Sequence, residues 1–402
     1  MSNEAAAVLP TIYRSLLRLG RQLDKNPLSK ALLIAQPAHL FDRRSRAVIK
    51  LPSLSGWSSA LESFNGGEFY SPENSAQQAV RGAFTNPPPG DPLDVGFTAL
   101  RSLGLAAMGG EALEREHAFD GGGAVERLSA VRATSTVKAG SLLLTHPVSC
   151  LKQPTLHHAV ILIIAADDDS VSGLVINKPL NVTLSAAISD KVKISVGETL
   201  SSYPLYKGGD VSERQLLLLH DIEGLSESTP VVDGLYATSS FPEVRDALEK
   251  YHEETAAAET EVAMGDDASG GIRRRSPPRV KCVAGFAGWA KAQLQAELQR
   301  NVWFLVEAED AAAVAMMEPP AAAADGSSGG GGGDGAAWLR DEMWSGALKQ
   351  LGGEHAALAR FPGDHEVVWK HMQDIWSKQS EELHRRIDLL EPKDGKGGGD
   401  ES

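Results

Sequence analysis

The chain has 402 residues, 42% of them hydrophobic, which is enough for two modest domains or for one domain with tails and insertions. Its formal net charge of -14 disfavours direct nucleic-acid binding by the whole surface, which would need a basic footprint, although a local basic patch stays open. Two cysteines cannot make a disulfide framework or a zinc site. Since no apolar run approaches the roughly 20 residues of a membrane span, we expect a soluble protein in a reducing compartment.

The first predicted element is a basic amphipathic helix over residues 11–25. Apolar and basic side chains each recur there at helical spacing and occupy separate faces. The apolar face carries Ile12, Leu16, Leu19 and Leu23, and the basic face carries Arg14, Arg18, Arg21 and Lys25. Three interpretations stay open: an organelle-targeting segment, a membrane-surface helix, or a folded helix with a solvated basic side, which is the commonest of the three.

Helical pieces broken by loops continue to about residue 105. The stretches 75–84 and 94–108 have helix-like patterns, and the turn-rich "TNPPPGDP" separates them. We therefore expect a helical module over residues 8–105, followed by a glycine-punctuated linker over residues 106–134.

From about residue 135 the pattern changes to short runs rich in Val, Ile and Leu. Turn residues bound each run, which is typical of strands. Helix-like stretches at 183–192, 241–254 and 289–300 lie between the runs. The sequence therefore indicates an α+β or α/β domain over residues 135–365.

Two stretches interrupt this domain, at residues 255–279 and 319–337. Neither can bury enough surface to offset the entropy of ordering it, so we expect disordered insertions. A returning helix is expected at 338–352, and a C-terminal helix with a disordered tail over 366–402.

Three motifs in the second domain have a specific order and spacing: Gly173–Leu180, Tyr206–Gly209 and the block Gly285–Trp303. They resemble the AlgH/YqgE family over about residues 138–352. The resemblance implies a compact α+β domain with a bent, partly barrel-like mixed sheet wrapped by helices, preceded in this chain by an all-α module. No biochemical activity is established for that family, and a regulatory role, including transcriptional regulation, is attached to some members.

The resemblance therefore implies a non-enzymatic regulatory or adaptor protein that acts through protein partners. Neither its oligomeric state nor a ligand follows from the motifs.

The N-terminal helix carries a second resemblance. Ile12, Tyr13 and Arg14 resemble the start of a LYR-motif protein, and Phe84 matches the downstream phenylalanine of that motif. Ile12 replaces the usual leucine, and residues 42–75 are inserted relative to a compact three-helix module. The resemblance implies a small helical bundle that binds an acylated acyl carrier protein in a mitochondrial or related organellar setting. A chloroplast or the cytoplasm stays open, as does a plain helical extension.

The polar strand end Asn177-Lys178-Pro179 has two interpretations. In a ligand site, Lys178 would contact an anion and Asn177 would be a polar clamp. In a purely structural role, Pro179 ends the strand because it cannot donate to a ladder, and Asn177 makes a turn through its own side chain. The structural interpretation is favoured.

Two glycine-containing motifs invite comparison with anion sites. Lys207, Gly208 and Gly209 lack the spaced glycines and the Lys-Ser/Thr pair of a phosphate loop, and paired glycines more often mark a turn or bulge. Gly288 and Trp289 precede a predicted helix, as an anion site at a helix N-terminus would. Small residues there equally allow the helix to pack closely on the sheet.

An enzymatic alternative stays open beside these structural roles. His220 is followed by an aspartate that could orient it, as in catalytic triads. The alternative is therefore a hydrolase or transferase that uses a polar pocket near Lys178, Lys207 and His220. His157 and His158 are neighbours on a predicted strand, whose side chains point to opposite faces, so they cannot share one ion without distortion. We expect neither a metal nor another cofactor.

Overall fold

The computed structural model describes residues 3–31, 39–41, 48–50, 75–85, 128–148, 153–188, 190–264, 276–299, 301–318 and 335–361, with single positions between 96 and 111 and between 363 and 370. The chain divides into two units, one made of residues 1–118 and 364–402 and the other of residues 119–363. None of the helices in the described ranges has the length and apolar composition of a membrane span.

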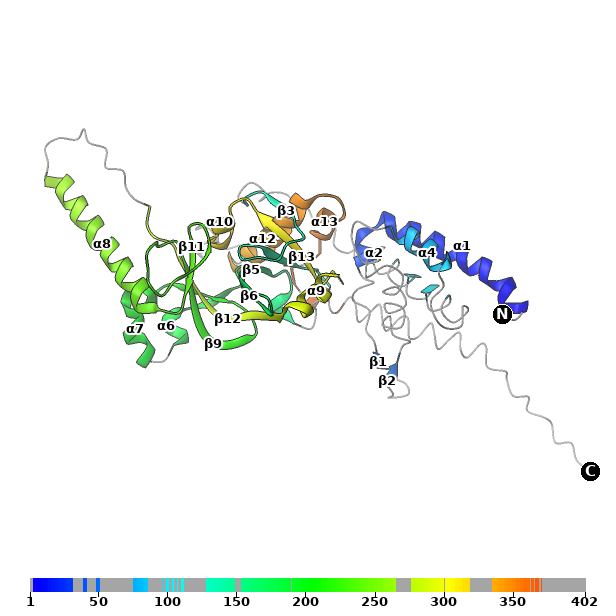
Figure 1. Ribbon diagram of the computed structural model, residues 1–402, viewed down its shortest axis with the longest axis horizontal. Helices are drawn as coiled ribbons and strands as arrows, with labels where there is room; N and C mark the ends of the chain where they lie inside the picture. The colour runs from blue at the N-terminus through cyan, green and yellow to red at the C-terminus, as the bar shows by residue number, and fades with distance from the viewer. Residues whose placement is uncertain are drawn as a thin grey trace, which may run out of the picture. The chain divides into compact units, whose positions relative to one another are not determined.

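The first unit is mainly helical and includes a small two-stranded sheet (Figure 1). Its elements are α1 (Asn3–Lys25), α2 (Pro27–Ala31), β1 (His39–Phe41), β2 (Val48–Lys50) and α4 (Ala76–Thr85). The two strands pair antiparallel, with Leu40 opposite Ile49. The expectation of an all-α module is therefore wrong at these residues. Three-residue strands are too short to show a periodic pattern, although the β-branched Val48 and Ile49 favour a strand.

α1 is the amphipathic helix that the spacing predicts. On one face Ile12, Leu16 and Leu23 are at most 2% exposed. Burying each of these side chains stabilises the unit by roughly 1.5–3 kcal/mol. On the other face the cations are exposed, namely Arg14, Arg18, Arg21 and Lys25. The apolar face is therefore used inside the unit, and the basic face is left to solvent.

α1 and α4 pack closely and are tied together at one end. A Cβ atom on Gly20 would lie 3.0 Å from the Cα atom of Gln77, so a small residue is needed where the helices meet. The Asp24 carboxylate accepts hydrogen bonds from the Ala76 N–H at 2.5 Å and from the Ser75 hydroxyl at 2.8 Å. Asp24 thereby caps the N-terminus of α4 from the neighbouring helix.

Helical positions between residues 96 and 111 contact α1 and α2. Ala99, Leu103 and Ala107 are buried, and the Ser29 hydroxyl donates to the Ala107 carbonyl at 3.1 Å. These positions fall at helical spacing in the stretch 94–108, which the sequence predicts to be helical.

The second unit is built on one mixed sheet. Its strands are β3 (Val131–Ala133), β4 (Leu142–Thr145), β5 (Val160–Ala166), β6 (Ser170–Val175), β7 (Pro179–Thr183), β8 (Pro204–Lys207), β9 (Val211–His220), β10 (Thr229–Val232), β11 (Leu235–Thr238), β12 (Val280–Ala290) and β13 (Trp303–Ala308). The main path runs β10-β11-β9-β12-β6-β5-β4-β13-β3, and β8 pairs with both β12 and β7. Only the pair β8–β12 is parallel among these strands. The arrangement confirms the predicted α+β class.

β12 joins two halves of this sheet. Its first half pairs with β9 and β8, and its second half pairs with β6. The register against β9 shifts between Ala284 and Phe286, where Gly285 has a φ of +73°. A left-handed conformation of this kind favours glycine and is typical of a bulge, which bends a strand.

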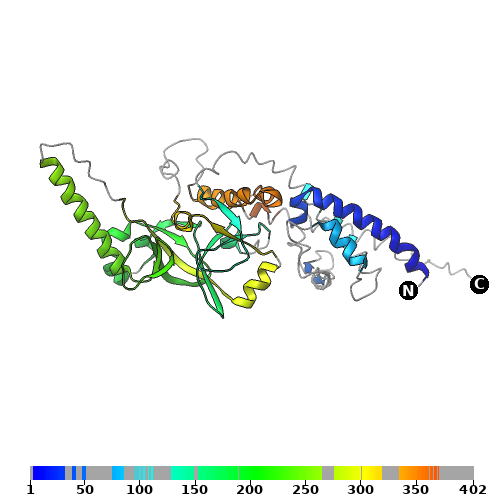
Figure 2. The same ribbon diagram turned by 45° about the horizontal axis from the view of Figure 1, so that its top comes forward.

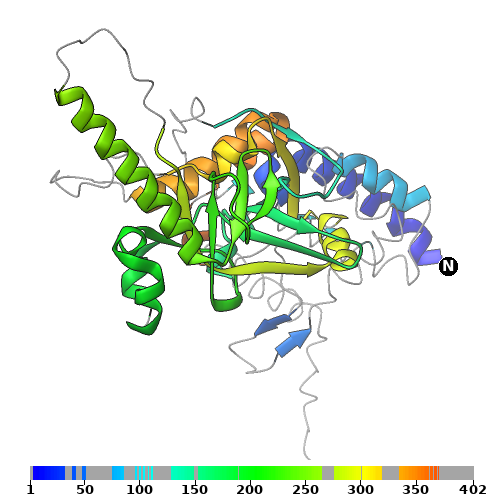
Figure 3. The same cartoon turned by 60° about the vertical axis from the view of Figure 1, so that its left-hand side comes forward.

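The sheet is bent but not closed (Figure 3). The predicted partly barrel-like form is therefore wrong, since β10 and β3 end the path without pairing with one another among the described strands. A barrel requires tilt and stagger shared by all strands. Here a bulge interrupts β12 at Gly285, and the two end strands have only four and three residues.

Helices cover the sheet on more than one side (Figures 1 and 2). They are α6 (Leu184–Ala187), α7 (Asp190–Ser201), α8 (Phe241–Met264), α9 (Lys291–Gln299), α10 (Ala311–Ala315), α12 (Gly335–Leu351) and α13 (Gly353–Leu358), with a 3-10 turn η3 (Pro154–Leu156). Leu200 of α7 and Val244 of α8 share a core with Cys282 of β12. Leu294 of α9 shares a second core with Ile161 and Trp303.

Some predicted boundaries differ from the structure. α8 extends to Met264, so the expectation of disorder is wrong for residues 255–264. The Ala- and Glu-rich sequence there has high intrinsic helix propensity even without an apolar period. β3 falls within the stretch expected to be a linker. Of the predicted insertions, residues 265–275 and 319–334 lie outside the described residues, as does the chain from residue 371 onward.

Candidate functional site

The polar end of β6 is held by the Asn177 side chain. Asn177 is fully buried. Its Oδ1 atom accepts a hydrogen bond from the Val160 N–H at 2.9 Å, and its Nδ2 atom donates to the His158 carbonyl at 2.8 Å. Both partners lie at the start of β5. The amide therefore takes the place of two backbone groups and extends the β5–β6 pairing beyond the last residue of the strand.

The second motif, Lys207-Gly208-Gly209, meets this strand end through the backbone. The Lys207 N–H donates to the Lys178 carbonyl at 2.9 Å, and the Val175 N–H donates to the Gly208 carbonyl at 2.8 Å. The Gly208 N–H in turn donates to the Ala284 carbonyl of β12 at 2.8 Å. The two motifs and the bend in β12 thus form one hydrogen-bonded crossing of three segments.

Gly208 and Gly209 lie so close to the backbone of β12 that there is no room for a Cβ atom. A Cβ atom on Gly208 would lie 2.2 Å from the Gly285 carbonyl oxygen, and one on Gly209 would lie 2.2 Å from the Phe286 carbonyl carbon. Real Cβ atoms do not approach backbone atoms so closely. This geometry explains both glycines without a ligand.

The two lysines of the crossing already have partners. The Lys178 ammonium donates to the His157 carbonyl. The Lys207 ammonium lies 2.5 Å from the Glu213 carboxylate and 3.5 Å from that of Asp210. The hydrogen bond and charge of Lys207 hold the pKa of Glu213 below its ordinary value. An anion at Lys207 would therefore have to compete with two carboxylates.

His220 is not brought to this crossing. It pairs with Val280 across the β9–β12 ladder, whereas Lys207 pairs with Ala284. Four residues of extended chain separate these positions, or about 13 Å. The His220 ring is buried, with its Nε2 atom 2.9 Å from the Ser228 hydroxyl, and burial lowers its pKa.

Asp221 does not hold the His220 ring in the manner of a triad. Its carboxylate accepts hydrogen bonds from the backbone N–H of Arg279 at 2.8 Å and from the Arg279 guanidinium at 2.9 Å. The Nδ1 atom of His220 accepts from the Ile222 N–H at 3.2 Å.

Gly288 and Trp289 belong to a tryptophan clamp at the other end of β12. Gly288 pairs with Ser172 of β6. The indole N–H groups of Trp289 and Trp303 both donate to one oxygen of Glu297, at 3.0 and 2.7 Å, and the two rings meet edge to face at 5.8 Å. The motif therefore fixes α9 on the sheet.

In the first unit, the structure brings Tyr13 and Phe84 together. Their ring centroids are 4.5 Å apart, and Phe84 remains 37% exposed. Arg14 lies next to Tyr13 on the exposed face, where its guanidinium donates to the Pro10 carbonyl at 3.3 Å and to the Thr11 hydroxyl at 3.5 Å. The three residues of the LYR-like pattern are thus neighbours on α1 and α4.

Histidines gather around the start of β5. His158 stacks on His157 at 4.2 Å and on Trp344 of α12 at 3.6 Å. His146 at the end of β4 is buried, and burial together with the nearby His355 lowers its pKa to about 3. In the part of the chain that the structure describes, no group of three or more His, Cys, Asp or Glu side chains is arranged to hold a metal ion.

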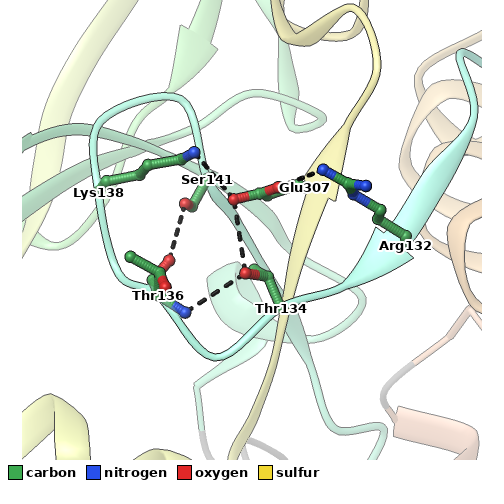
Figure 4. A network of polar contacts seen from close by, with 6 residues as sticks. All are labelled: Arg132, Thr134, Thr136, Lys138, Ser141 and Glu307. Carbon is green, nitrogen blue, oxygen red and sulfur yellow. Dashed lines mark hydrogen bonds and ion pairs between the residues drawn. The ribbon is translucent and has the colours of Figure 1, made fainter.

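Sequence reasoning missed two polar features of the sheet. Glu307 on β13 binds Lys138 at 3.0 Å and Arg132 at 3.2 Å (Figure 4), and these contacts lower its pKa. The second feature is Lys281 on β12, which is only 1% exposed. In the sequence, this buried lysine shows only as a single lysine inside an apolar strand pattern.

Comparison with known proteins finds relatives of the second unit in bacteria. The family model described as AlgH-like (DUF179) matches residues 142–266 and 260–323. A UPF0301 protein of Ralstonia nicotianae is 32% identical over 161 residues, which are 40% of this chain and 72% of the relative. A UPF0301 protein of Bacteroides thetaiotaomicron is 26% identical over 223 residues, which are 56% of this chain and 87% of the relative.

The chain therefore belongs to the AlgH-like family. Among solved structures, the AlgH protein of Pseudomonas aeruginosa matches with 21% identity and a TM-score of 0.31, over 49% of this chain and 93% of that protein. The AlgH-like match begins at residue 142, so the LYR-like assignment of the N-terminal helices stays a prediction.

Proposed function

We propose that this AlgH-like chain is a non-enzymatic adaptor or regulatory protein that binds an acyl carrier protein through the helices of its first unit. The observation that carries the proposal is the exposed basic face of α1. Its four cations, Arg14, Arg18, Arg21 and Lys25, recur at helical spacing opposite a buried apolar face. A helix whose apolar face is buried within the unit is better explained as a docking element than as a cleavable targeting segment.

Charge favours an acidic partner for this face. The chain as a whole has a net charge of -14, so a stripe of four positive charges stands out from the rest of the molecule. Complementary charge accelerates association and selects partners. Acyl carrier protein is the partner that the LYR-like residues imply, and an organellar setting would follow from it.

The ring contact between Tyr13 and Phe84 adds an apolar element beside the stripe. Phe84 keeps more than a third of its surface exposed in this contact. An aromatic group beside a basic stripe is typical of protein interfaces, in which a few aromatic and arginine side chains provide most of the binding free energy.

The enzymatic alternative, a hydrolase or transferase near Lys178, Lys207 and His220, receives less support. An enzyme needs its polar groups to converge within hydrogen-bond reach. The ladder register separates His220 from Lys207 by about 13 Å, and both lysines are engaged by protein groups. A regulatory role would accordingly be exercised through protein contact, since the acidic charge disfavours direct DNA binding.

The test is direct binding of purified acylated acyl carrier protein to the full chain. The charge-reversed variant Arg18→Glu/Arg21→Glu should weaken binding at least tenfold, and added salt should weaken binding to the wild type. The control Arg214→Glu/Lys250→Glu changes the same number of exposed cations in the second unit and should leave binding unchanged. Equal affinity for all three proteins, or no binding to the wild type, would refute the proposal.

A further inference from the structure

The second unit buries a lysine at the junction of three segments. Lys281 lies on β12 between Val280 and Cys282, which pair with His220 and Leu218 of β9. Its side chain is 1% exposed and is among the largest fully buried side chains of the described residues. Lysine is almost never buried this completely unless its ammonium group is well partnered.

The partners of Lys281 come from distant parts of the chain. Its Nζ atom donates to the carbonyl of Ile176, at the end of β6, at 3.2 Å, and to the carbonyl of Met317, just after α10, at 2.9 Å. The same atom lies 4.5 Å from the centroid of the Tyr206 ring on β8. A neutral amine has two N–H donors, and the two carbonyls can accept both of them.

Both carbonyls are neutral, so the charge of Lys281 has no close counter-ion. No ion pair of Lys281 is present among the described residues. The titratable groups around the site are Tyr206 and Tyr203 beside β8, Cys282 on β12 and Glu318 after α10. Burial lowers the pKa of Lys281 to about 7, against a smaller opposite effect of Glu318.

The tyrosines and Cys282 hold no charge near neutral pH, because burial raises the pKa of each of them. Lys281 is therefore the group of this site whose charge changes in the neutral range.

We propose that Lys281 is a proton-controlled latch, which holds the turn after α10 against the polar end of β6 when its amine is neutral and loosens that turn when its amine is charged. The Met317 carbonyl is the movable side of the latch, because it lies beyond the end of the five-residue helix α10 and outside the sheet. The Ile176 carbonyl is the fixed side, since Ile176 is bonded through its N–H to Val160 of β5 at 3.0 Å.

The direction of the effect follows from proton linkage. When the turn opens, Lys281 reaches water and regains an ordinary pKa of about 10.4. Between pH 7 and that value, the closed state holds a neutral amine and the open state holds an ammonium, so opening takes up a proton. Opening therefore becomes about tenfold rarer for each pH unit of increase above 7, and it is independent of pH below 7.

Hydrogen exchange of the full chain, corrected for intrinsic amide rates, tests the latch. In the wild type, protection of peptides spanning residues 311–318 should rise by up to about tenfold per pH unit between pH 7 and 9. Peptides from β10 and β11 should show no such rise. Lys281→Met removes the titrating group and should abolish the dependence, whereas the control Lys250→Met, at a side chain that is 75% exposed, should retain it.

A flat pH profile in the wild type, or the same slope in Lys281→Met, would overturn the proposal. Should Lys281→Met fail to fold, NMR of wild-type protein with 13C-labelled lysine decides the question. One lysine Cε resonance should titrate near pH 7. If every lysine titrates above pH 9, the latch does not exist.

Discussion

At the scale of single residues, buried polar side chains are what distinguish this AlgH-like domain from a simple apolar sheet. Asn177 at the end of β6 bonds to backbone groups at the start of β5, Lys281 on β12 bonds to carbonyls of two distant segments, and the half-buried Glu297 accepts from two buried indoles. A buried donor or acceptor left without a partner costs roughly 1–3 kcal/mol. Such residues therefore contribute to specificity of the fold as well as to its stability.

The Glu297 clamp gives a first prediction. Glu297→Leu leaves the buried indole N–H groups of Trp289 and Trp303 without an acceptor, so the free energy of unfolding should fall by about 2–4 kcal/mol. Urea unfolding followed by tryptophan fluorescence measures the change. Glu297→Gln keeps a carbonyl acceptor and should lose less, and Glu253→Leu on the exposed face of α8 should lose almost nothing. Equal stability of Glu297→Leu and the wild type would contradict the clamp.

His146 gives a prediction about acid. Its pKa is about 3 in the folded chain and about 6.5 when unfolded, so the unfolded state binds the proton more readily. Its neutral form therefore supports stability above pH 6.5, and stability should fall by up to about 1.4 kcal/mol per pH unit as pH drops from 6.5 toward 3. His146→Gln should have a shallower slope in urea titrations at several pH values.

The matched control for this slope is His252→Gln, at an exposed position on α8. It should follow the wild type at every pH. If His146→Gln and His252→Gln have identical slopes, another group causes the acid sensitivity.

Some of these residue-scale features could be predicted from the sequence, and others could not. A turn or bulge at Gly208 could be predicted, because paired glycines have a well-defined local role. The turn expected from the Asn177 side chain is instead a pair of hydrogen bonds to Val160 of β5 and to His158 just before that strand. These partners could not be predicted, since His158 and Val160 are distant in sequence and only the ladder register brings them near. Lys281 was missed because one lysine in an apolar strand is ordinarily solvated at an edge, whereas β12 is central.

At the scale of elements, the crossing of β6, β8 and β12 depends on glycine. Gly208→Ala places a Cβ atom 2.2 Å from the Gly285 carbonyl oxygen, which requires the backbone to shift. We expect a loss of at least about 2 kcal/mol in the free energy of unfolding, by analogy with other overpacked sites, or failure to fold. Thermal unfolding and soluble yield are the measurements.

Gly346→Ala is the matched control for this crossing. Gly346 lies inside α12, where the nearest atom to an added Cβ is 3.7 Å away. Alanine is the better helix former, so this variant should gain roughly 0.5–1 kcal/mol. A tolerated Gly208→Ala would mean that the close approach is not required.

Most elements of the second unit could be predicted from their own residues. The runs rich in Val, Ile and Leu correspond to β4, β5, β6, β9, β10, β11, β12 and β13, and the helix expected at 289–300 is α9. β3, β7 and β8 were missed, since none of them lies in a run rich in Val, Ile and Leu, and their pairing depends on partners elsewhere in the chain. The open sheet was mistaken for a partial barrel because closure depends on whether the end strands pair, and β10 and β3 do not pair with one another among the described strands.

At the scale of the whole molecule, family membership and function rest on different parts of the chain. The AlgH-like match lies within the second unit, where the contacts of the candidate site residues hold the fold together. The proposed partner binds the first unit, where the basic face of α1 is exposed. The motifs of the second unit could predict the family, and the LYR-like residues of α1 and α4 supply the proposed partner. The sequence could not show which of those side chains remain exposed after packing.

The most direct test of this account is a pull-down of the tagged full chain from its own cells, beside the variant Tyr13→Ala/Arg14→Ala, with bound proteins identified by mass spectrometry. The account predicts that acyl carrier protein is enriched with the wild type and lost with the variant. Absence of acyl carrier protein from the wild-type sample, or its equal recovery with the variant, would contradict the adaptor role of the N-terminal helices.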